Sequence, residues 1–539
     1  MFQLHHQATA NTPAHDEKRL CTEGPYLDYV TKIDALYPGT ASPDPLNHHI
    51  GSRVGQSRSV VLERTPDHRW SRVIFNNHME IKDHFSERQK IDKSEPAVVP
   101  RQRIYILDGL DPQYVEAFGS YFFMDPKFFV RQERNDLWNL KMGGSVIQNA
   151  LVLPSLVNPE RYFCVKYREV REFGHQLRDW RTVCALTGRH LAAIGFEGRL
   201  DTTAAVARKF SFWSRKDEND SWDVIILCDP PVHKLHIMSR AMTSAAFHGE
   251  PFQGGYPDFV KREDGRQSQT QTLEPPPRTS FLDDLCFYYE HYSEVLAHSC
   301  GSQATITPKL ATIFPLKIVC SHYLKVIDYF EMIINRLAKV EWKLSRRSDY
   351  ADYDDHEGAN VQEQWSSLQL SARRLAEFSD DVEDILRDLA IPITPPDTPS
   401  HSHWTSSDED LRYIYQRLQK MKNKVDQLTS ATMGLSNIVG SRQALSEARR
   451  SVKEAKSTKT LTVVGLVFIP LAYTCALFSM SDDFRPGSHL FWVYFAVSVP
   501  LIFLVFVGTF VIQLGYDENV AWSAKRFKGA LLDVGGKRT

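Results

Sequence analysis

Two long apolar stretches near the C-terminus dominate the pattern of hydrophobic and polar positions along the chain. They cover residues 461–480 and 490–514, and neither contains a charged side chain. A helix rises about 1.5 Å per residue and the hydrocarbon core of a bilayer is about 30 Å thick, so about 20 apolar residues cross it. Helices of a soluble core are rarely apolar on every side for this length. The two stretches therefore predict a transmembrane hairpin over residues 457–515.

Basic residues flank this hairpin at both outer ends. They are Arg449, Arg450, Lys453, Lys456 and Lys459 before the first stretch, and Lys525, Arg526, Lys528, Lys537 and Arg538 after the second. The connecting segment instead holds Asp482, Asp483 and Arg485. Because positive charge marks the cytoplasmic side, we expect a multi-pass protein with both termini in the cytoplasm and a basic cytoplasmic tail over residues 516–539. The charge pattern does not identify the membrane, and the plasma membrane is the favoured location.

The region before the hairpin has a helical period. Apolar residues recur every three or four positions over residues 308–344 and 361–389, which predicts two helices. Four prolines between Pro392 and Pro399 then predict an extended linker over residues 391–407. A heptad seam begins at Leu411, and no proline occurs between Asp408 and Ile469, so one helix is expected from Asp408 to Met480. Residues 301–456 are thus interpreted as a helical bundle and stalk.

The N-terminal half differs in composition and in the spacing of its apolar residues. Residues 1–95 are rich in His, Pro, Ser, Asn and Arg without a sustained period, and we interpret them as a mostly disordered tail. Strands are predicted at residues 103–107, 162–167, 209–213 and 222–227, with the last two forming a hairpin; helices are predicted at 112–118 and 281–298. The expected fold class is an α+β (α/β) cytoplasmic domain over residues 96–300, followed by the long helical stalk and two C-terminal transmembrane helices.

Composition and motifs narrow the possible functions. The net charge is −2, so no global field suggests nucleic acid as a partner. The eight cysteines form no CxxC pair, which favours a reducing compartment. No Walker loop, GxSxG, HExxH or GxGxxG motif occurs, so we expect no enzyme and no cofactor. The pair His233-x-x-His236 is a weak metal-binding motif beside a simpler interpretation as part of a loop.

The first apolar stretch resembles the pore-lining span of the CorA-type divalent-cation channels. In that family the first of two C-terminal spans ends in Gly-Met-Asn, after a phenylalanine-aliphatic-proline-leucine-threonine run. Here Phe468-Ile469-Pro470-Leu471-Ala472 stands in the same register before Ser479-Met480-Ser481. The proline, the methionine and the spacing agree, whereas Ala472, Ser479 and Ser481 replace the threonine, the glycine and the asparagine. The run Phe478-Ser479-Met480 is similar to a variant of filamentous-fungal CorA-like proteins, so the resemblance is to a fungal type with a degenerate signature.

This resemblance implies a homopentamer in the lipid bilayer, a pore lined by the first span, and divalent cations as cargo, with Mg²⁺ favoured. By position, Thr458, Leu461, Ile469, Ala472 and Ser481 would face the lumen. Ser481, Asp482 and Asp483 would meet the ion at the outer mouth, where carboxylates concentrate cations. The shorter side chain of Ser481 leaves the choice of ion open, and a Zn²⁺, Ni²⁺ or Co²⁺ transporter on the same fold is an alternative.

Two further questions remain open at the level of the sequence: whether the chain transports ions, and what its acidic clusters do. The three signature replacements are also consistent with a transport-inactive, membrane-anchored scaffold. The family further implies regulatory cations at subunit boundaries, for which the acidic clusters are candidates (Asp352, Asp354 and Asp355; Asp380, Asp381, Glu383 and Asp384). A solvated loop and a solvated helix face are the simpler interpretations of these clusters, and we favour them.

Overall fold

The computed structural model describes residues 20–21, 23–34, 57–65, 67, 69–94, 100–133, 158–174, 177, 182–194, 202–217, 220–237, 243–246, 249–260, 275–292, 307–347, 355–394, 406–479 and 487–515. The chain forms two compact units, Met1–Gly434 and Leu435–Thr539.

A large sheet organises the first unit. Its eight strands are β1 (Arg58–Arg64), β2 (Trp70–Phe75), β3 (Gln102–Asp108), β4 (Tyr162–Phe173), β6 (Leu191–Ala193), β7 (Thr202–Lys216), β8 (Trp222–Cys228) and β11 (Gly249–Pro251). The order is β11-β4-β7-β8-β3-β1-β2, with β6 paired to β7. Only β3 and β8 run parallel among these described pairs, with Gln102 opposite Trp222. A smaller sheet joins β5 (Thr182–Cys184), β9 (Lys234–Ile237) and β10 (Thr243–Ala246).

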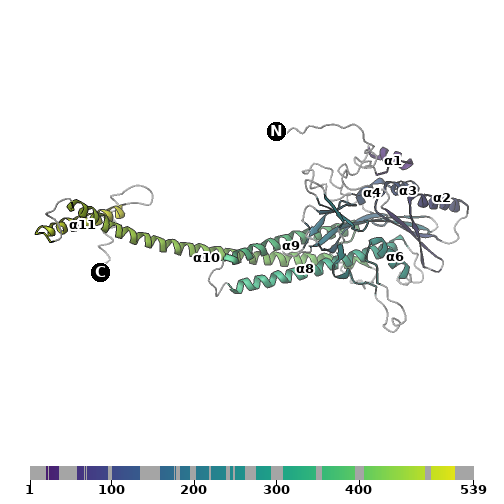
Figure 1. Cartoon of the computed structure of the whole chain (residues 1–539). Helices are drawn as coiled ribbons and strands as arrows, with labels where there is room; N and C mark the ends of the chain where they lie inside the picture. Colours follow the sequence, from purple (N-terminus) through teal and green to yellow (C-terminus); the bar gives the residue numbers. More distant parts are fainter. Residues whose placement is uncertain are drawn as a thin grey trace, which may run out of the picture. The chain divides into compact units, whose positions relative to one another are not determined.

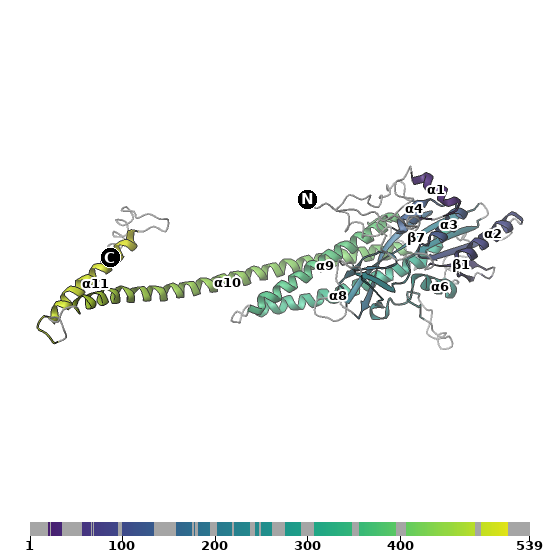
Figure 2. The same ribbon diagram turned by 45° about the horizontal axis from the view of Figure 1, so that its top comes forward.

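Helices cover both faces of the large sheet. One face carries α1 (Pro25–Asp34), α2 (His78–Ser94), α3 (Pro112–Phe122) and α4 (Pro126–Glu133), and the other carries α6 (Phe281–His291) and α8 (Ile313–Arg347), as Figures 1 and 2 show. Short 3₁₀ turns occupy Phe252–Gly254 and Pro308–Thr312. Side chains of a strand point alternately to the two faces, so Tyr105 and Leu107 pack with α1–α4 while Ile104 and Ile106 pack with α6 and α8. The sheet is therefore the middle layer of three.

Local sequence explains where several of these helices begin and end. Asp111 caps α3: its carboxylate accepts a hydrogen bond from the Gln113 N–H, and Pro112 occupies the first helical position. The helix ends where Phe123 adopts a left-handed conformation with φ 50°. At α6 the hydroxyl of Ser280 accepts from the Asp283 N–H. Caps of this kind fix the chain direction at the edge of the sheet.

Two further long helices extend the bundle. They are α9 (Asp355–Asp388) and α10 (Ser407–Phe478), and apolar side chains of both join the core beneath α8. In α10 these are Leu411, Ile414, Leu418, Met421 and Val425, which follow the heptad seam predicted from the sequence. The described part of the second unit contains the rest of α10 and α11 (Phe491–Gly515). Helix α10 is continuous over 72 residues despite Pro470.

The fold-class prediction is confirmed: a mixed α/β domain precedes long helices and two apolar C-terminal helices. One boundary is wrong, because residues 1–95 are not simply a disordered tail. They contribute α1, β1, β2 and α2, and Val61 of β1 is fully buried in the sheet. The short run Val60-Val61-Leu62 pairs with β3 through long-range contacts, which no local period in the sequence reveals.

Candidate ion-conducting hairpin

The residues predicted to line a pore share one side of α10. Thr458, Leu461, Ile469 and Ala472 fall within an arc of about 80° when each residue advances the helix by about 100°. All four residues are exposed, Leu461 by 73% and Ile469 by 71% of the residue's possible surface. We call these four residues the open face of α10.

The opposite side of α10 contacts α11. Thr474 lies about 180° from the centre of the open face by the same helical geometry, with Pro470 and Phe478 about 40° to either side of it. Pro470 and Thr474 are buried and Phe478 is half-buried. The Phe478 ring meets the Tyr494 ring edge-on, with 6.1 Å between centroids. Helix α11 therefore covers one side of α10 and leaves the open face uncovered within a single chain.

The hydroxyl groups of Thr474 and Ser498 join α10 to α11 one turn after Pro470. The Ser498 hydroxyl donates to the Thr474 hydroxyl oxygen over 2.9 Å, and Thr474 in turn donates to the Pro470 carbonyl over 3.0 Å. Proline carries no N–H, so the carbonyl of Leu466 lacks its usual helical partner. Polar side chains that bond across apolar helices are a common means of holding membrane helices together. The hydrogen bonds thus fix α11 at the proline turn of α10.

The outer end of the hairpin is only partly described. Ser479 is exposed, and its N–H donates to the Cys475 carbonyl over 3.0 Å in the last helical turn. Met480, Ser481, Asp482 and Asp483 lie outside the described residues. The ring at the outer mouth therefore stays a prediction.

The candidate regulatory acids on α9 make contacts within the chain. Asp381 accepts from Arg168 Nε at 2.7 Å and from Lys166 Nζ at 3.2 Å, and both of these residues lie on β4. Asp384 pairs with Arg387, and Glu383 accepts from the Tyr415 hydroxyl at 3.4 Å. Asp352 and Asp354 are outside the described residues. Asp381 thus attaches α9 to the sheet rather than presenting a free ligand.

The histidine pair is not arranged as a metal site. His236 lies in β9, whereas His233 precedes the strand and is exposed. The spacing of the two histidines suits ligands on one helix face, and His236 lies in a strand instead, so the helical premise of the motif does not apply. Across the described residues, no group of three or more His, Cys, Asp or Glu side chains is placed to hold a metal ion.

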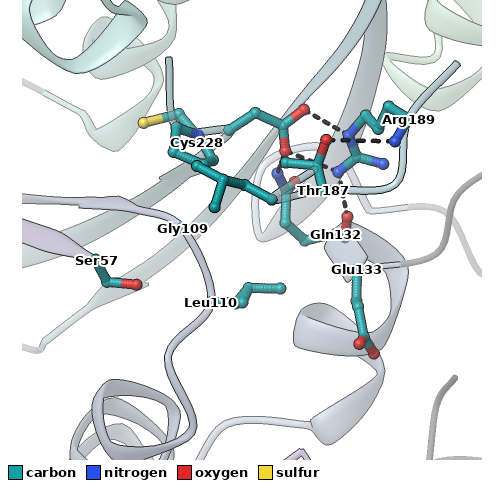
Figure 3. A pocket seen from close by; sticks show the side chains of 11 residues that line it. Ser57, Gly109, Leu110, Gln132, Glu133, Thr187, Arg189 and Cys228 are labelled. Atoms are coloured by element: carbon teal, nitrogen blue, oxygen red, sulfur yellow. Dashed lines mark hydrogen bonds and ion pairs between the residues drawn. The ribbon is translucent and has the colours of Figure 1, made fainter. Parts of the chain in front are cut away.

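A pocket of about 50 Å³ lies at the carboxyl ends of the parallel strands β3 and β8 (Figure 3). Arg189 and Asp229 form a buried ion pair on one side, with Nε–Oδ2 at 2.5 Å, and the Gln132 side-chain amide donates to Asp229. Burial raises the pKa of the Cys228 thiol well above its usual value, so this sulfur stays protonated. The ion pair joins the loop between β5 and β6 to the residue that follows β8. The protonated thiol of Cys228 is a poor nucleophile.

The sequence pattern did not reveal the buried charges of β4. Arg168, Glu169 and Arg171 are all less than 10% exposed, and the predicted strand ended at Tyr167, before these three residues. Charged side chains are rarely buried unless they are paired, so the density of charge in this run gave no signal for burial.

No protein-family model and no curated protein matches the chain. Among solved structures, the complete CorA magnesium transporter from Methanocaldococcus jannaschii is similar at 9% identity and a TM-score of 0.24, over 86% of this chain and 98% of that one. The full-length CmaX protein is similar at 10% identity and a TM-score of 0.26, over 85% and 99%. At these scores the fold class rests on the elements described above.

Proposed function

We propose that the chain is one subunit of a homopentameric membrane channel for divalent cations, with Mg²⁺ as the favoured cargo and α10 as the pore-lining helix. The observation that carries the proposal is the open face of α10, which lies opposite the α11 contact. In the described chain, three helices are long and apolar enough to cross a bilayer. In the first, Pro308–Trp342, 72% of the apolar 18-residue window is buried, whereas the corresponding windows of α10 and α11 are 11% and 6% buried. Only the last two therefore need a bilayer or another copy around them.

The chemistry of the open face determines how such a channel works. Leu461, Ile469 and Ala472 are apolar, so a ring of copies would enclose a narrow hydrophobic tube that closes by expelling water. Thr458 supplies a polar ring at the inner end. At the outer end the Ser481 hydroxyl accepts hydrogen bonds from the water that Mg²⁺ keeps in its first shell. Each copy adds Asp482, Asp483 and Arg485, so the mouth carries a net negative charge that attracts cations.

Flux into proteoliposomes tests the proposal directly. Purified full-length protein should admit Mg²⁺ down a gradient, and parallel assays with Zn²⁺, Co²⁺ and Ni²⁺ identify the cargo. Ser481→Asn should alter the ratio of ion fluxes, because the longer amide narrows the ring. A protein that carries no divalent cation, before or after this substitution, would be the transport-inactive scaffold instead.

A further inference from the structure

A second, smaller cavity lies within the first unit and has no role in the proposed ion path. Its volume is about 20 Å³, and it lies between β4, β7, the turn after β11, the start of α6, and α8. Four cationic side chains line it against two carboxylic acids, namely Arg171, Arg208, Arg278 and Lys325 against Glu169 and Asp284. This imbalance is unusual for a cavity whose walls are mostly buried.

Two buried guanidinium groups share a single carboxylate in this cavity. Glu169 Oε1 lies 2.6 Å from Arg171 Nη2, while Oε2 lies 3.4 Å from Arg208 Nε. The remaining nitrogens of Arg208 donate to the carbonyl oxygens of Pro230 at 2.7 Å and Asp229 at 3.1 Å, which are neutral groups. The Asp229 carboxylate also attracts Arg208, but it is already paired with Arg189. Arg171 is 7% and Arg208 2% exposed. A buried charge that is not fully balanced costs free energy, so the cavity favours an additional negative charge.

The second acid does not correct the imbalance. The Asp284 carboxyl accepts hydrogen bonds from the Tyr256 hydroxyl at 2.8 Å and from the backbone N–H of Arg278 at 2.7 Å. Burial raises its pKa to about 7 despite these hydrogen bonds, so Asp284 is partly protonated near neutral pH. Lys325 has a loose contact with Asp328, at 3.8 Å. Within the described residues, the buried Nε of Arg278 has no hydrogen-bond partner.

Neutral donors complete the lining. The His322 ring stacks on Tyr167, with 5.6 Å between centroids, and meets the Tyr256 ring edge-on at 5.0 Å. Burial lowers the pKa of His322 to about 4, against the attraction of Glu169, so the ring is neutral and offers one N–H. The groups facing the cavity from β4, β7, α6, α8 and the turn therefore combine excess positive charge with uncharged donors.

We propose that this cavity binds one small inorganic anion of the size of chloride. A site needs about 10–15 Å³ to hold a water molecule, so about 20 Å³ suits a single halide ion, whereas a tetrahedral oxyanion would need the rim side chains of Arg278 and Lys325 to move. The anion lies between the sheet and α8, and its charge offsets that of Arg171 and Arg208.

Chloride-35 NMR on the purified full-length protein in detergent tests this site. Exchange with a bound state broadens the chloride line, and we expect excess broadening that saturates with chloride and is removed by bromide. Lys325→Gln should reduce the excess several-fold, and Arg278→Gln should do the same. Lys339→Gln is the matched control, because Lys339 is an exposed residue of the same helix away from the cavity.

The outcomes separate clearly. Broadening that does not saturate, or that falls equally in Lys325→Gln and Lys339→Gln, would overturn the site. Circular dichroism of each variant excludes unfolding as the cause of a loss. The readout involves no ion flux across a membrane, so its result is independent of whether the channel proposal holds.

Discussion

The Ser498 hydroxyl donates to the hydroxyl oxygen of Thr474 over 2.9 Å, and these side chains are 1% and 3% exposed. This contact joins α11 to α10 four residues after Pro470. It also fixes which side of α10 remains available to other copies, since the open face lies opposite. The hydroxyl pair is thus a structural determinant of the proposed pore.

Thr474→Val should weaken the hairpin. The substitution keeps the shape of the side chain and removes the hydroxyl, and hydrogen bonds between membrane helices contribute about 0.6 kcal/mol on average and up to about 1.7 kcal/mol. A double-mutant cycle that combines Thr474→Val with Ser498→Ala measures the interaction free energy between the two side chains, from unfolding titrations with a denaturing detergent. Thr462→Val is the control, because the Thr462 hydroxyl bonds only within its own helix, to the Thr458 carbonyl. Zero coupling between positions 474 and 498 would contradict the contact.

Cysteine cross-linking can test the open face. Ile469 and Phe503 are both 71% exposed in the single chain, but only Ile469 belongs to the open face. In a Cys475→Ser background, Ile469→Cys should form disulfide-linked dimers in membranes under mild oxidation, because the proposed pore brings this position of neighbouring copies together and one cysteine per copy forms one disulfide. Phe503→Cys on α11 should stay monomeric on a non-reducing gel. The reverse pattern would place α11 at the axis.

The N-terminal strands should be essential to the stability of the sheet. Val61→Ala removes two buried methyl groups and should cost about 2 kcal/mol of the free energy of unfolding, through lost burial and a residual cavity. Val73→Ala in the neighbouring β2 should change it by less than about 0.5 kcal/mol, since Val73 is 45% exposed. Melting temperatures of the two variants provide the comparison. Equal effects would indicate that β1 is peripheral.

The β4–α9 ion pairs should make a large contribution to stability. Arg168 is fully buried, contacts Asp381 and Glu377 at 2.7 Å each, and lies over the Phe378 ring. Arg168→Ala leaves Asp381 near a single remaining cation, Lys166, and breaking a buried pair in this way costs about 3–5 kcal/mol. Arg450→Ala should have almost no effect, because the Arg450–Glu454 pair is exposed. Thermal unfolding of both variants tests the contrast.

Asp284 should make stability depend on pH near neutrality. Its pKa is about 7 in the folded chain and near 3.8 when unfolded. Between these two values the folded state holds a proton that the unfolded state has lost. The contribution of Asp284 to the free energy of unfolding is therefore fully present below about pH 4 and is lost as the pH rises through 7. In Asp284→Asn the melting temperature, relative to the parent, should therefore rise between pH 5 and pH 8. A constant difference over this range would contradict the raised pKa.

The sequence predicted those elements whose signal is local. The strand at residues 103–107, the hairpin of 209–213 with 222–227, and the helix that became α10 each have their own period, and the structure contains all three. The parallel pairing of β3 with β8 and the insertion of β1 beside β3 depend on contacts between distant residues, so no local pattern encodes them. The pore-lining role of Leu461 and Ile469 was implied by the family resemblance and stays a prediction. The hydroxyl contact between Thr474 and Ser498 required three-dimensional packing.

The strand order has a consequence for synthesis of the chain. When β3 is synthesised, its neighbour β1 is already present because it precedes β3 in the chain. Its other neighbour, β8, is synthesised only much later. Until then one edge of β3, including Ile104 and Ile106, has no partner strand, and such edges invite pairing with other chains. Nascent chains stalled before residue 222 should therefore need a chaperone, and those released after residue 228 should not aggregate through this edge.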